Sequence, residues 1–294
     1  ACKHLQKCLS RRKKIKIFNA DIDNDVYMDG IFENENIGAI MHCAADISVP
    51  ESVENPLKYY YNNTSKSIKL LEKAKRNGVN NFVFSCTAAV YGEPPENVAG
   101  SIPETQPCRP INAYGESKLM FETILKRYSE VNPNFKYASL RYFNVAGSDI
   151  GNRVQDIHWR QKGNIIPKIL SRVIDNKGEF RIFGTDYDTS DGSCIRDYIH
   201  PTDLANAHLL CIEKDVKGVF NLGTSRGVSV WEIVKEVVSA TNSEINVVHD
   251  KRRKGDPKIL VANPTRFMKE TGWEAAYNIG EIIRTAYKAY RKVK

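Results

Sequence analysis

Tyr114 and Lys118 lie four residues apart at the start of an amphipathic stretch, and Thr87 lies at the end of a strand-like run upstream. On a helix, this spacing places the phenol and the ammonium group on one face. A free phenol, with a pKa of about 10, is a poor base at neutral pH, but a neighbouring positive charge favours the phenolate. Such a phenol can remove a proton from a substrate hydroxyl, while the Thr87 hydroxyl shares or relays it. These residue types and spacings predict a hydride-transfer site.

The spacing Tyr-x-x-x-Lys is also common on solvated helices, where it has no function. The order of the surrounding segments favours the catalytic interpretation. A strand-like run ends in Ser85-Cys86-Thr87, a proline-rich loop follows, and residues 112–118 open a helix.

The elements that must position these residues alternate between strand-like and helix-like patterns, which predicts a parallel sheet flanked by helices. The expected fold class is therefore α/β, with a doubly wound, Rossmann-type sheet. Gly78 is typical of the C-terminal end of a helix. In the first half, the expected strands are 15–18, 38–45, 81–89 and 137–144, and the expected helices are 25–36, 56–77 and 114–131.

After Gly147 the pattern changes to a loop over 151–163 and then to a shorter mixture of helices and strands. We expect a smaller mixed α/β lobe packed on the first half. Thr202 is the expected cap of a helix over 201–213. The other expected elements are a strand over 178–184 and helices over 228–241 and 279–291.

The composition is that of a globular protein. The chain has 294 residues, 41% of them hydrophobic, which can form one large domain or two closely joined ones. No apolar run approaches the roughly 18 residues that span a bilayer, and no signal peptide precedes the first strand-like run. We expect a soluble, cytoplasmic protein that has no membrane partner. The seven cysteines form no Cys-x-x-Cys pair, which argues against zinc and against disulfides and favours reduced thiols.

The formal net charge is +8, and the densest basic run is Arg11-Arg12-Lys13-Lys14. This run lacks interleaved aromatic residues and any recognisable nucleic-acid-binding module, so we expect no nucleic acid partner. A positive excess also suits small anionic substrates such as nucleotides. Charge alone does not choose between these partners.

Several spaced segments resemble those of the extended short-chain dehydrogenase/reductase family, over nearly the whole chain. Within that family the chain is most similar to the UDP-glucose (UDP-galactose) 4-epimerases. The segments are Asp21-Ile22, 42–45, 60–63, 85–92, 114–118, 140–144 and 182–203. The resemblance implies NAD as cofactor, a UDP-hexose as substrate, no metal and a homodimer. It also implies reversible epimerisation at C4 through a 4-keto intermediate, with transient hydride transfer to NAD.

One feature of that family is missing. Its members open with a strand and a Gly-x-x-Gly-x-x-Gly turn that holds the cofactor pyrophosphate at a helix N-terminus. This sequence has no such turn, and its first strand-like run corresponds to the family's third. We expect either a piece of a longer protein or a shortened product with an impaired cofactor site. On this basis residues 1–147 form a dinucleotide-binding domain without its first βαβ portion. Residues 148–294 form mainly the UDP-sugar lobe, with segments that return to the first domain.

The resemblance also assigns site residues. Tyr114 is the catalytic base, Lys118 lowers the pKa of its phenol, and Thr87 hydrogen-bonds the sugar 4-oxygen. The residues implied for the cofactor are Asp21, Ile22, Ala44, Ala45, Asn62, Ser85, Tyr114, Lys118 and Tyr142. Those implied for the substrate are Thr87, Asn144, Asn164, Phe183, Arg196, Arg253, Asp256 and Leu260. Ile47 replaces a lysine that is usual near the cofactor.

Other interpretations remain open at this stage. Arg196 beside Asp197 is equally typical of a structural ion pair, and Asn144 of a strand end. Nucleotide-sugar 4,6-dehydratases carry an Asp-Glu pair after the threonine, because elimination of water needs an added acid and base. Here the pair is Ala88-Ala89, so dehydration is disfavoured. In the epimerases that the chain resembles, a residue near Leu260 limits room for an N-acetyl group, and Leu260 is intermediate in size. A UDP-GlcNAc or UDP-glucuronate 4-epimerase, or a non-catalytic UDP-sugar-binding remnant, is therefore an alternative.

Overall fold

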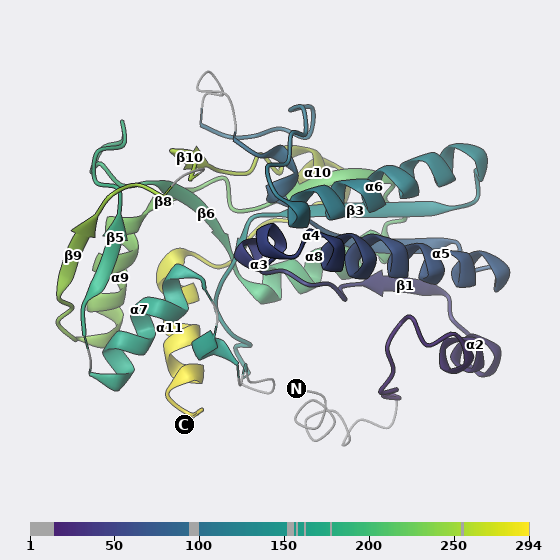
Figure 1. The fold of residues 1–294 in the computed structure, drawn as a ribbon, viewed down its shortest axis with the longest axis horizontal. Helices are drawn as coiled ribbons and strands as arrows, with labels where there is room; N and C mark the ends of the chain where they lie inside the picture. The colour runs from purple at the N-terminus through teal and green to yellow at the C-terminus, as the bar shows by residue number, and fades with distance from the viewer. Residues whose placement is uncertain are drawn as a thin grey trace.

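A four-stranded parallel sheet with strand order β1-β2-β3-β7 forms the centre of the first half of the chain in the computed structural model (Figure 1). The structure describes residues 15–93, 100–151, 156, 158–161, 163–176, 178–253 and 256–293. The strands are β1 (Ala39–His42), β2 (Asn81–Thr87), β3 (Lys136–Tyr142) and β7 (Gly218–Leu222). The expected parallel sheet is confirmed, and β7 brings a segment of the second half into it.

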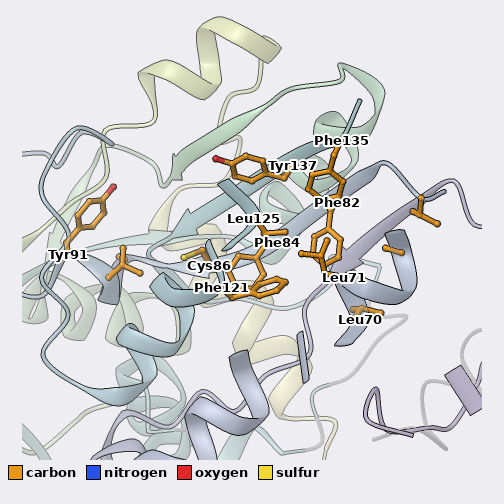
Figure 2. Close-up of a cluster of buried hydrophobic side chains, with 14 of the residues drawn as sticks. Leu70, Leu71, Phe82, Phe84, Cys86, Tyr91, Phe121, Leu125, Phe135 and Tyr137 are labelled. Carbon is orange, nitrogen blue, oxygen red and sulfur yellow. The ribbon is translucent and has the colours of Figure 1, made fainter. Parts of the chain in front are cut away.

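Helices cover both faces of this sheet because successive strand side chains point to opposite sides. Phe82 and Phe84 of β2 pack in one cluster with residues of α2, α5 and α6 (Figure 2). Val83 packs in another cluster with residues of α8 and α10. These helices are α2 (Asp25–Asn34), α5 (Lys66–Arg76), α6 (Ala113–Val131), α8 (Pro201–Glu213) and α10 (Thr265–Thr271).

The helix expected over 56–77 is present, but it changes type along its length. It consists of α4 (Pro56–Tyr59), the π-helical segment η1 (Tyr60–Ser65) and α5. The η1 segment packs on the start of α6, where Thr64 Oγ1 donates to Ser117 O at 2.9 Å. A π-helical turn within an α-helix is rare and often marks a functional site. Here it lies next to the turn that carries Tyr114.

The second half forms a smaller lobe beside the sheet (Figure 1). Its strands are β5 (Phe180–Phe183) with β9 (Val247–Asp250), and β6 (Ile195–Ile199) with β4 (Asn144–Val145), β8 (Gly227–Ser229) and β10 (Ile259–Leu260). Helices α7 (Ile165–Asp175), α9 (Val230–Thr241) and α11 (Ile279–Tyr290) enclose a core that contains Trp159. The remaining short elements are α3 (Val49–Glu54), η2 (Ala88–Tyr91) and η3 (Trp159–Gln161).

Two local expectations are wrong. Residues 15–20 form no strand, because no described segment pairs with them, and Ile15 and Phe18 remain 41% and 42% exposed. His200, not Thr202, caps α8, since its Nδ1 accepts from Thr202 N at 3.1 Å.

Some expected features lie outside the described residues, namely the basic run at 11–14, Cys2, Cys8 and part of the loop over 151–163. Within the described part of the chain, no helix is both long and apolar enough to cross a bilayer.

Candidate active site

The candidate site lies at the carboxyl edge of the parallel sheet, where ligands commonly bind in α/β folds. Ser85 and Thr87 end β2, and Tyr142 ends β3. Helix α6 begins at this edge, because Asn112 Oδ1 accepts from Gly115 N at 2.9 Å and caps it. A Cβ atom on Gly115 would lie 2.7 Å from Ala89 O. Glycine therefore lets the first turn of α6 approach the turn after Thr87.

Tyr114 is placed by that close approach. Its side chain is 9% exposed, and its ring meets Tyr59 edge-on with centroids 6.5 Å apart. Burial raises the pKa of Tyr114 to about 12, and a hydrogen bond with Thr87 lowers it only in part. The structure brings Tyr114 and Thr87 together, as the sequence predicts.

Lys118 lies one turn further along α6 and is buried. Its Nζ donates to Ser85 O at 2.9 Å and lies 4.8 Å from the ring centroid of Phe84. Burial lowers the pKa of Lys118 to about 8. The expectation that the ammonium keeps the pKa of Tyr114 low is wrong for this structure. The reason is that burial disfavours the charged forms of both groups.

A hydrogen-bonded cluster that the sequence did not predict surrounds Ser85. Its Oγ donates to Cys43 Sγ at 3.1 Å and lies 3.0 Å from Nε2 of His208, a residue of α8. Burial raises the pKa of Tyr142 despite a hydrogen bond with Ser85. No local signal in the sequence could have found His208, because it lies 123 residues from Ser85.

The residues expected at the adenine end lie before α2 and are accessible. The Asp21 carboxylate accepts from Asp23 N at 2.9 Å and from Lys66 Nζ at 2.9 Å. These two bonds lower the pKa of Asp21. Ile22 is partly exposed.

After β1, Ala44 is exposed and Ala45 half-buried. The expected polar contact Asn62 is half-buried, whereas Asn63 is buried and holds the loop after β1. Its Oδ1 accepts from Asp46 N at 2.8 Å, and its Nδ2 donates to Ser117 Oγ at 3.1 Å.

Two of the expected substrate residues, Arg196 and Leu260, lie opposite each other on the paired strands β6 and β10. The Arg196 guanidinium forms an ion pair with Asp256. It does not pair with Asp197, whose buried carboxylate accepts from the N–H groups of Thr224, Ser225 and Ala262. The simple alternative of an Arg196–Asp197 pair is therefore wrong.

The remaining substrate residues are distributed as follows. The Arg253 guanidinium stacks 3.8 Å from the centroid of the Phe183 ring. Asn144 Nδ2 donates to Asp197 O at 3.2 Å. Asn164 precedes α7, is exposed and makes no side-chain capping bond. Leu260 of β10 is paired in register with Arg196.

Two cavities lie elsewhere. One of about 590 Å³ lies beside Phe18 and α2, and one of about 430 Å³ lies between α6 and Arg266. Neither is lined by Tyr114, Lys118 or Thr87. The chemistry, rather than cavity size, therefore identifies the candidate site. Within the described residues, no group of three or more His, Cys, Asp or Glu side chains could hold a metal ion.

Known proteins resemble the chain over most of its length. Residues 2–223 match the model of the NAD dependent epimerase/dehydratase family. The UDP-glucose 4-epimerase of Lactobacillus helveticus is 40% identical over 283 residues, which cover 95% of this chain and 84% of the relative.

Two solved structures extend the comparison. The UDP-glucose 4-epimerase from Bifidobacterium longum, in complex with NAD+ and UDP, has a TM-score of 0.87 and 32% identity. The match covers 99% of this chain and 87% of that one. The UDP-Glc/GlcNAc 4-epimerase from Campylobacter jejuni has a TM-score of 0.84 and 37% identity, with 98% and 87% covered.

Proposed function

The chain belongs to the NAD dependent epimerase/dehydratase family, and from this premise we propose that it interconverts UDP-glucose and UDP-galactose by epimerisation at C4. The observation that carries the proposal is the burial of Tyr114 and Lys118 one helical turn apart on α6, with Lys118 Nζ donating to Ser85 O at the end of the strand that carries Thr87. A phenol in this position can move a proton to and from a sugar hydroxyl that Thr87 orients. The identity with the Lactobacillus helveticus enzyme supports this substrate class.

NAD is the proposed cofactor, since its nicotinamide can accept the C4 hydride of the sugar and return it to the opposite face of a 4-keto intermediate. Exposed Ala44 and half-buried Ala45 leave room at the strand end, and the accessible Asp21 carboxylate can accept from an adenine amino group. The sequence contains no Gly-x-x-Gly-x-x-Gly turn. These residues fit the adenine and nicotinamide ends of the dinucleotide, and none of them is assigned to its pyrophosphate. The other residues proposed to contact NAD are Ile22, Asn62, Ser85, Lys118 and Tyr142.

Tyr114 acts as the base toward the sugar 4-hydroxyl and as the acid when the alcohol forms again. Burial holds its pKa at about 12, so proton removal near neutral pH needs positive charge beside the phenol. Lys118 is the proposed source of that charge on the protein. Its pKa of about 8 leaves it largely protonated at pH 7, and its bond to Ser85 O fixes its position.

The UDP moiety is proposed to bind beside β6 and β10. Arg196 and Arg253 have the geometry to bind a diphosphate, because a guanidinium donates two parallel hydrogen bonds to it. Phe183 offers a ring face to the uracil. Asp256, which pairs with Arg196, is positioned to accept from a ribose hydroxyl. The proposed sugar contacts are Asn144, Asn164, Leu260 and Thr87.

The boundary between the two domains is proposed at residue 147, with β7, α8 and α10 returning to the first domain. A homodimer through a helix pair that includes α6 is also proposed. Met120 of α6 and Leu57 of α4, which packs on α6, support it because they are 45% and 77% exposed. We place the protein in the cytoplasm.

The direct test is the interconversion of UDP-glucose and UDP-galactose by the protein supplied with NAD. Tyr114→Phe removes the hydroxyl but keeps the buried ring, so we expect turnover to fall by roughly 10²–10⁴-fold. The unfolding midpoint should change little. Unchanged turnover in this variant would contradict the proposed role.

Substrate preference is tested with UDP-GlcNAc. The Campylobacter jejuni neighbour, a UDP-Glc/GlcNAc 4-epimerase, supports this second candidate. If Leu260 limits the space beside Arg196, Leu260→Ser should raise turnover of UDP-GlcNAc relative to UDP-glucose. A protein that binds UDP but neither binds NAD nor epimerises either sugar is a UDP-sugar binder instead.

A further inference from the structure

Cys43, Ser85 and His208 form a cluster in which the thiol and the imidazole have no role in the proposed epimerase chemistry. Cys43 directly follows β1 and is exposed, whereas Ser85 and His208 are buried. Ser85 Oγ donates to Cys43 Sγ at 3.1 Å and lies 3.0 Å from His208 Nε2. A thiol, a hydroxyl and an imidazole are thus joined in one chain of hydrogen bonds.

The imidazole of His208 is oriented to act as a base. Its Nδ1 lies 2.8 Å from Leu204 O. Because a carbonyl oxygen only accepts, Nδ1 carries the hydrogen, and Nε2 is left as the basic nitrogen facing Ser85. When Nε2 is protonated, it donates to Ser85 Oγ, and the Ser85 hydroxyl donates to the Cys43 sulfur. The geometry therefore supports an imidazolium and a thiolate bridged by one hydroxyl.

The charges of the cluster agree with this arrangement. Burial raises the pKa of the Cys43 thiol, but the nearby His208 and the Ser85 hydroxyl outweigh it, so the pKa lies below the ordinary value. Burial lowers the pKa of His208, but the nearby Cys43 and the bond to Leu204 O outweigh it, so that pKa is raised. The other titratable groups near the sulfur are Lys118, whose charge favours the thiolate, and Tyr142.

The other described cysteines are different. Cys86 and Cys211 are buried, and burial raises the pKa of both, that of Cys211 to about 12. Burial also raises the pKa of Cys108 and Cys194. Thiolate character and access together determine the reactivity of a cysteine. Of the cysteines that the structure describes, Cys43 alone combines them.

We propose that Cys43 is a modification site for reversible thiol–disulfide exchange with small-molecule disulfides, with Ser85 and His208 as the residues that keep it reactive. The Cys43 thiol proton passes through the Ser85 hydroxyl to His208. The thiolate attacks a disulfide R–S–S–R, forms Cys43–S–S–R and releases R–S⁻. The disulfide R–S–S–R is the oxidant, and a free thiol reverses the step.

The modification has a consequence for the site that rests on the proposed function. Cys43 is followed at once by Ala44 and Ala45, the residues proposed to lie under the dinucleotide. A mixed disulfide on Cys43 places its adduct there and competes with NAD.

The test uses 5,5′-dithiobis(2-nitrobenzoate) as the disulfide, with release of the coloured thiol giving the rate and peptide mass spectrometry giving the labelled residue. At pH 7 we expect Cys43 to be labelled first, at least roughly tenfold faster than Cys86 or Cys211. Cys43→Ser should remove this fast phase, and the matched control Cys108→Ser should leave it. A fast phase that maps to another cysteine overturns the proposal.

The role of His208 is tested by the pH dependence of the same reaction. His208→Gln should slow labelling of Cys43 by roughly tenfold at pH 7 and little at pH 9.5, where the thiol ionises without help. If this variant does not fold, the pH profile of the unaltered protein decides the question. If the labelling rate of Cys43 has its pH midpoint at the ordinary thiol pKa of about 8.5, the proposed role of His208 is wrong. A lower midpoint supports that role.

Protection by NAD separates this inference from the proposed function. If NAD slows the labelling of Cys43, both the thiol site and the proposed placement of NAD beside it are supported. If labelling is fast and unaffected by saturating NAD, the thiol site stands and the placement of the cofactor beside it is wrong.

Discussion

Two regions of the molecule achieve their chemistry in opposite ways. The proton-transfer region consists of Thr87, Tyr114 and Lys118, which are 8%, 9% and 3% exposed. The diphosphate region consists of Phe183, Arg196, Arg253 and Asp256. There Arg253 is exposed, and the side chains of Arg196 and Asp256 are 12% and 30% exposed.

The two regions therefore differ in the interactions that control their chemistry. In the proton-transfer region, burial moves the pKa values of the phenol and the ammonium toward their neutral forms, so a bound positive charge has a large effect. In the diphosphate region, each guanidinium already has an internal partner, Asp256 for Arg196 and the Phe183 ring for Arg253. Binding of a diphosphate there exchanges one partner for another.

Among the variants that compare the two regions, the largest effect is expected for Lys118→Met. Removal of the ammonium one helical turn from Tyr114 should lower turnover by roughly 10²-fold or more, because the proposed source of positive charge for the phenolate is then lost. The measurement is the interconversion of UDP-glucose and UDP-galactose.

The same variant has a stability signature. The folded-state pKa of Lys118, about 8, lies below the unfolded value of about 10.5, so the unfolded chain binds more protons between these pH values. The free energy of unfolding of the unaltered protein should therefore rise relative to Lys118→Met by about 3 kcal/mol from pH 7 to pH 10.5. Urea unfolding at both pH values measures it. A difference that does not vary with pH would mean that the amine is not desolvated.

A smaller effect, on binding, is expected for Arg196→Leu. Loss of charge-assisted hydrogen bonds to a diphosphate should weaken UDP binding by roughly 10–100-fold in a calorimetric titration. Arg181→Leu is the matched control, since Arg181 lies in the same lobe and pairs with Asp250 at 3.0 Å. Equal loss in both variants would indicate a general effect of charge rather than a contact.

The smallest effect is expected for Arg253→Ala. Neighbouring Arg252 and Arg253 each stack on a ring, at 4.1 Å from Tyr187 and 3.8 Å from Phe183. We expect Arg253→Ala to weaken UDP binding by roughly fivefold, and Arg252→Ala to leave it unchanged, because only the Phe183 pair is proposed to meet the nucleotide. If Arg252→Ala weakened UDP binding more than Arg253→Ala, the nucleotide would lie beside Tyr187 rather than Phe183.

Much of the fold could be predicted from local patterns. The apolar run over 81–89 and the helix-like period over 114–131 became β2 and α6 with ends shifted by two residues or fewer. The strand expected over 15–18 failed, because a strand also requires a partner. The π-helical segment η1 could not be predicted, since Tyr60–Ser65 takes that form where it packs on α6.

The candidate site could likewise be predicted only in part from the sequence. Tyr114, Lys118 and Thr87 were recognisable from their types and spacing. The pKa values of Tyr114 and Lys118 were not predictable, because they depend on how deeply the sheet and helices bury each group. The Arg196–Asp256 pair joins residues 60 positions apart and could not be read from the neighbouring Asp197.

By itself, the sequence determined which groups are available and which face of a helix they share, because helical periodicity and residue chemistry are local properties. Only the tertiary structure decided which of these groups are desolvated and which are paired across the chain. It placed His208 beside Ser85 and Cys43, and it buried Tyr114 and Lys118 together at the sheet edge. Burial and long-range hydrogen bonds arise only when distant segments pack, and in this protein they set the acidity of Tyr114, Lys118 and Cys43.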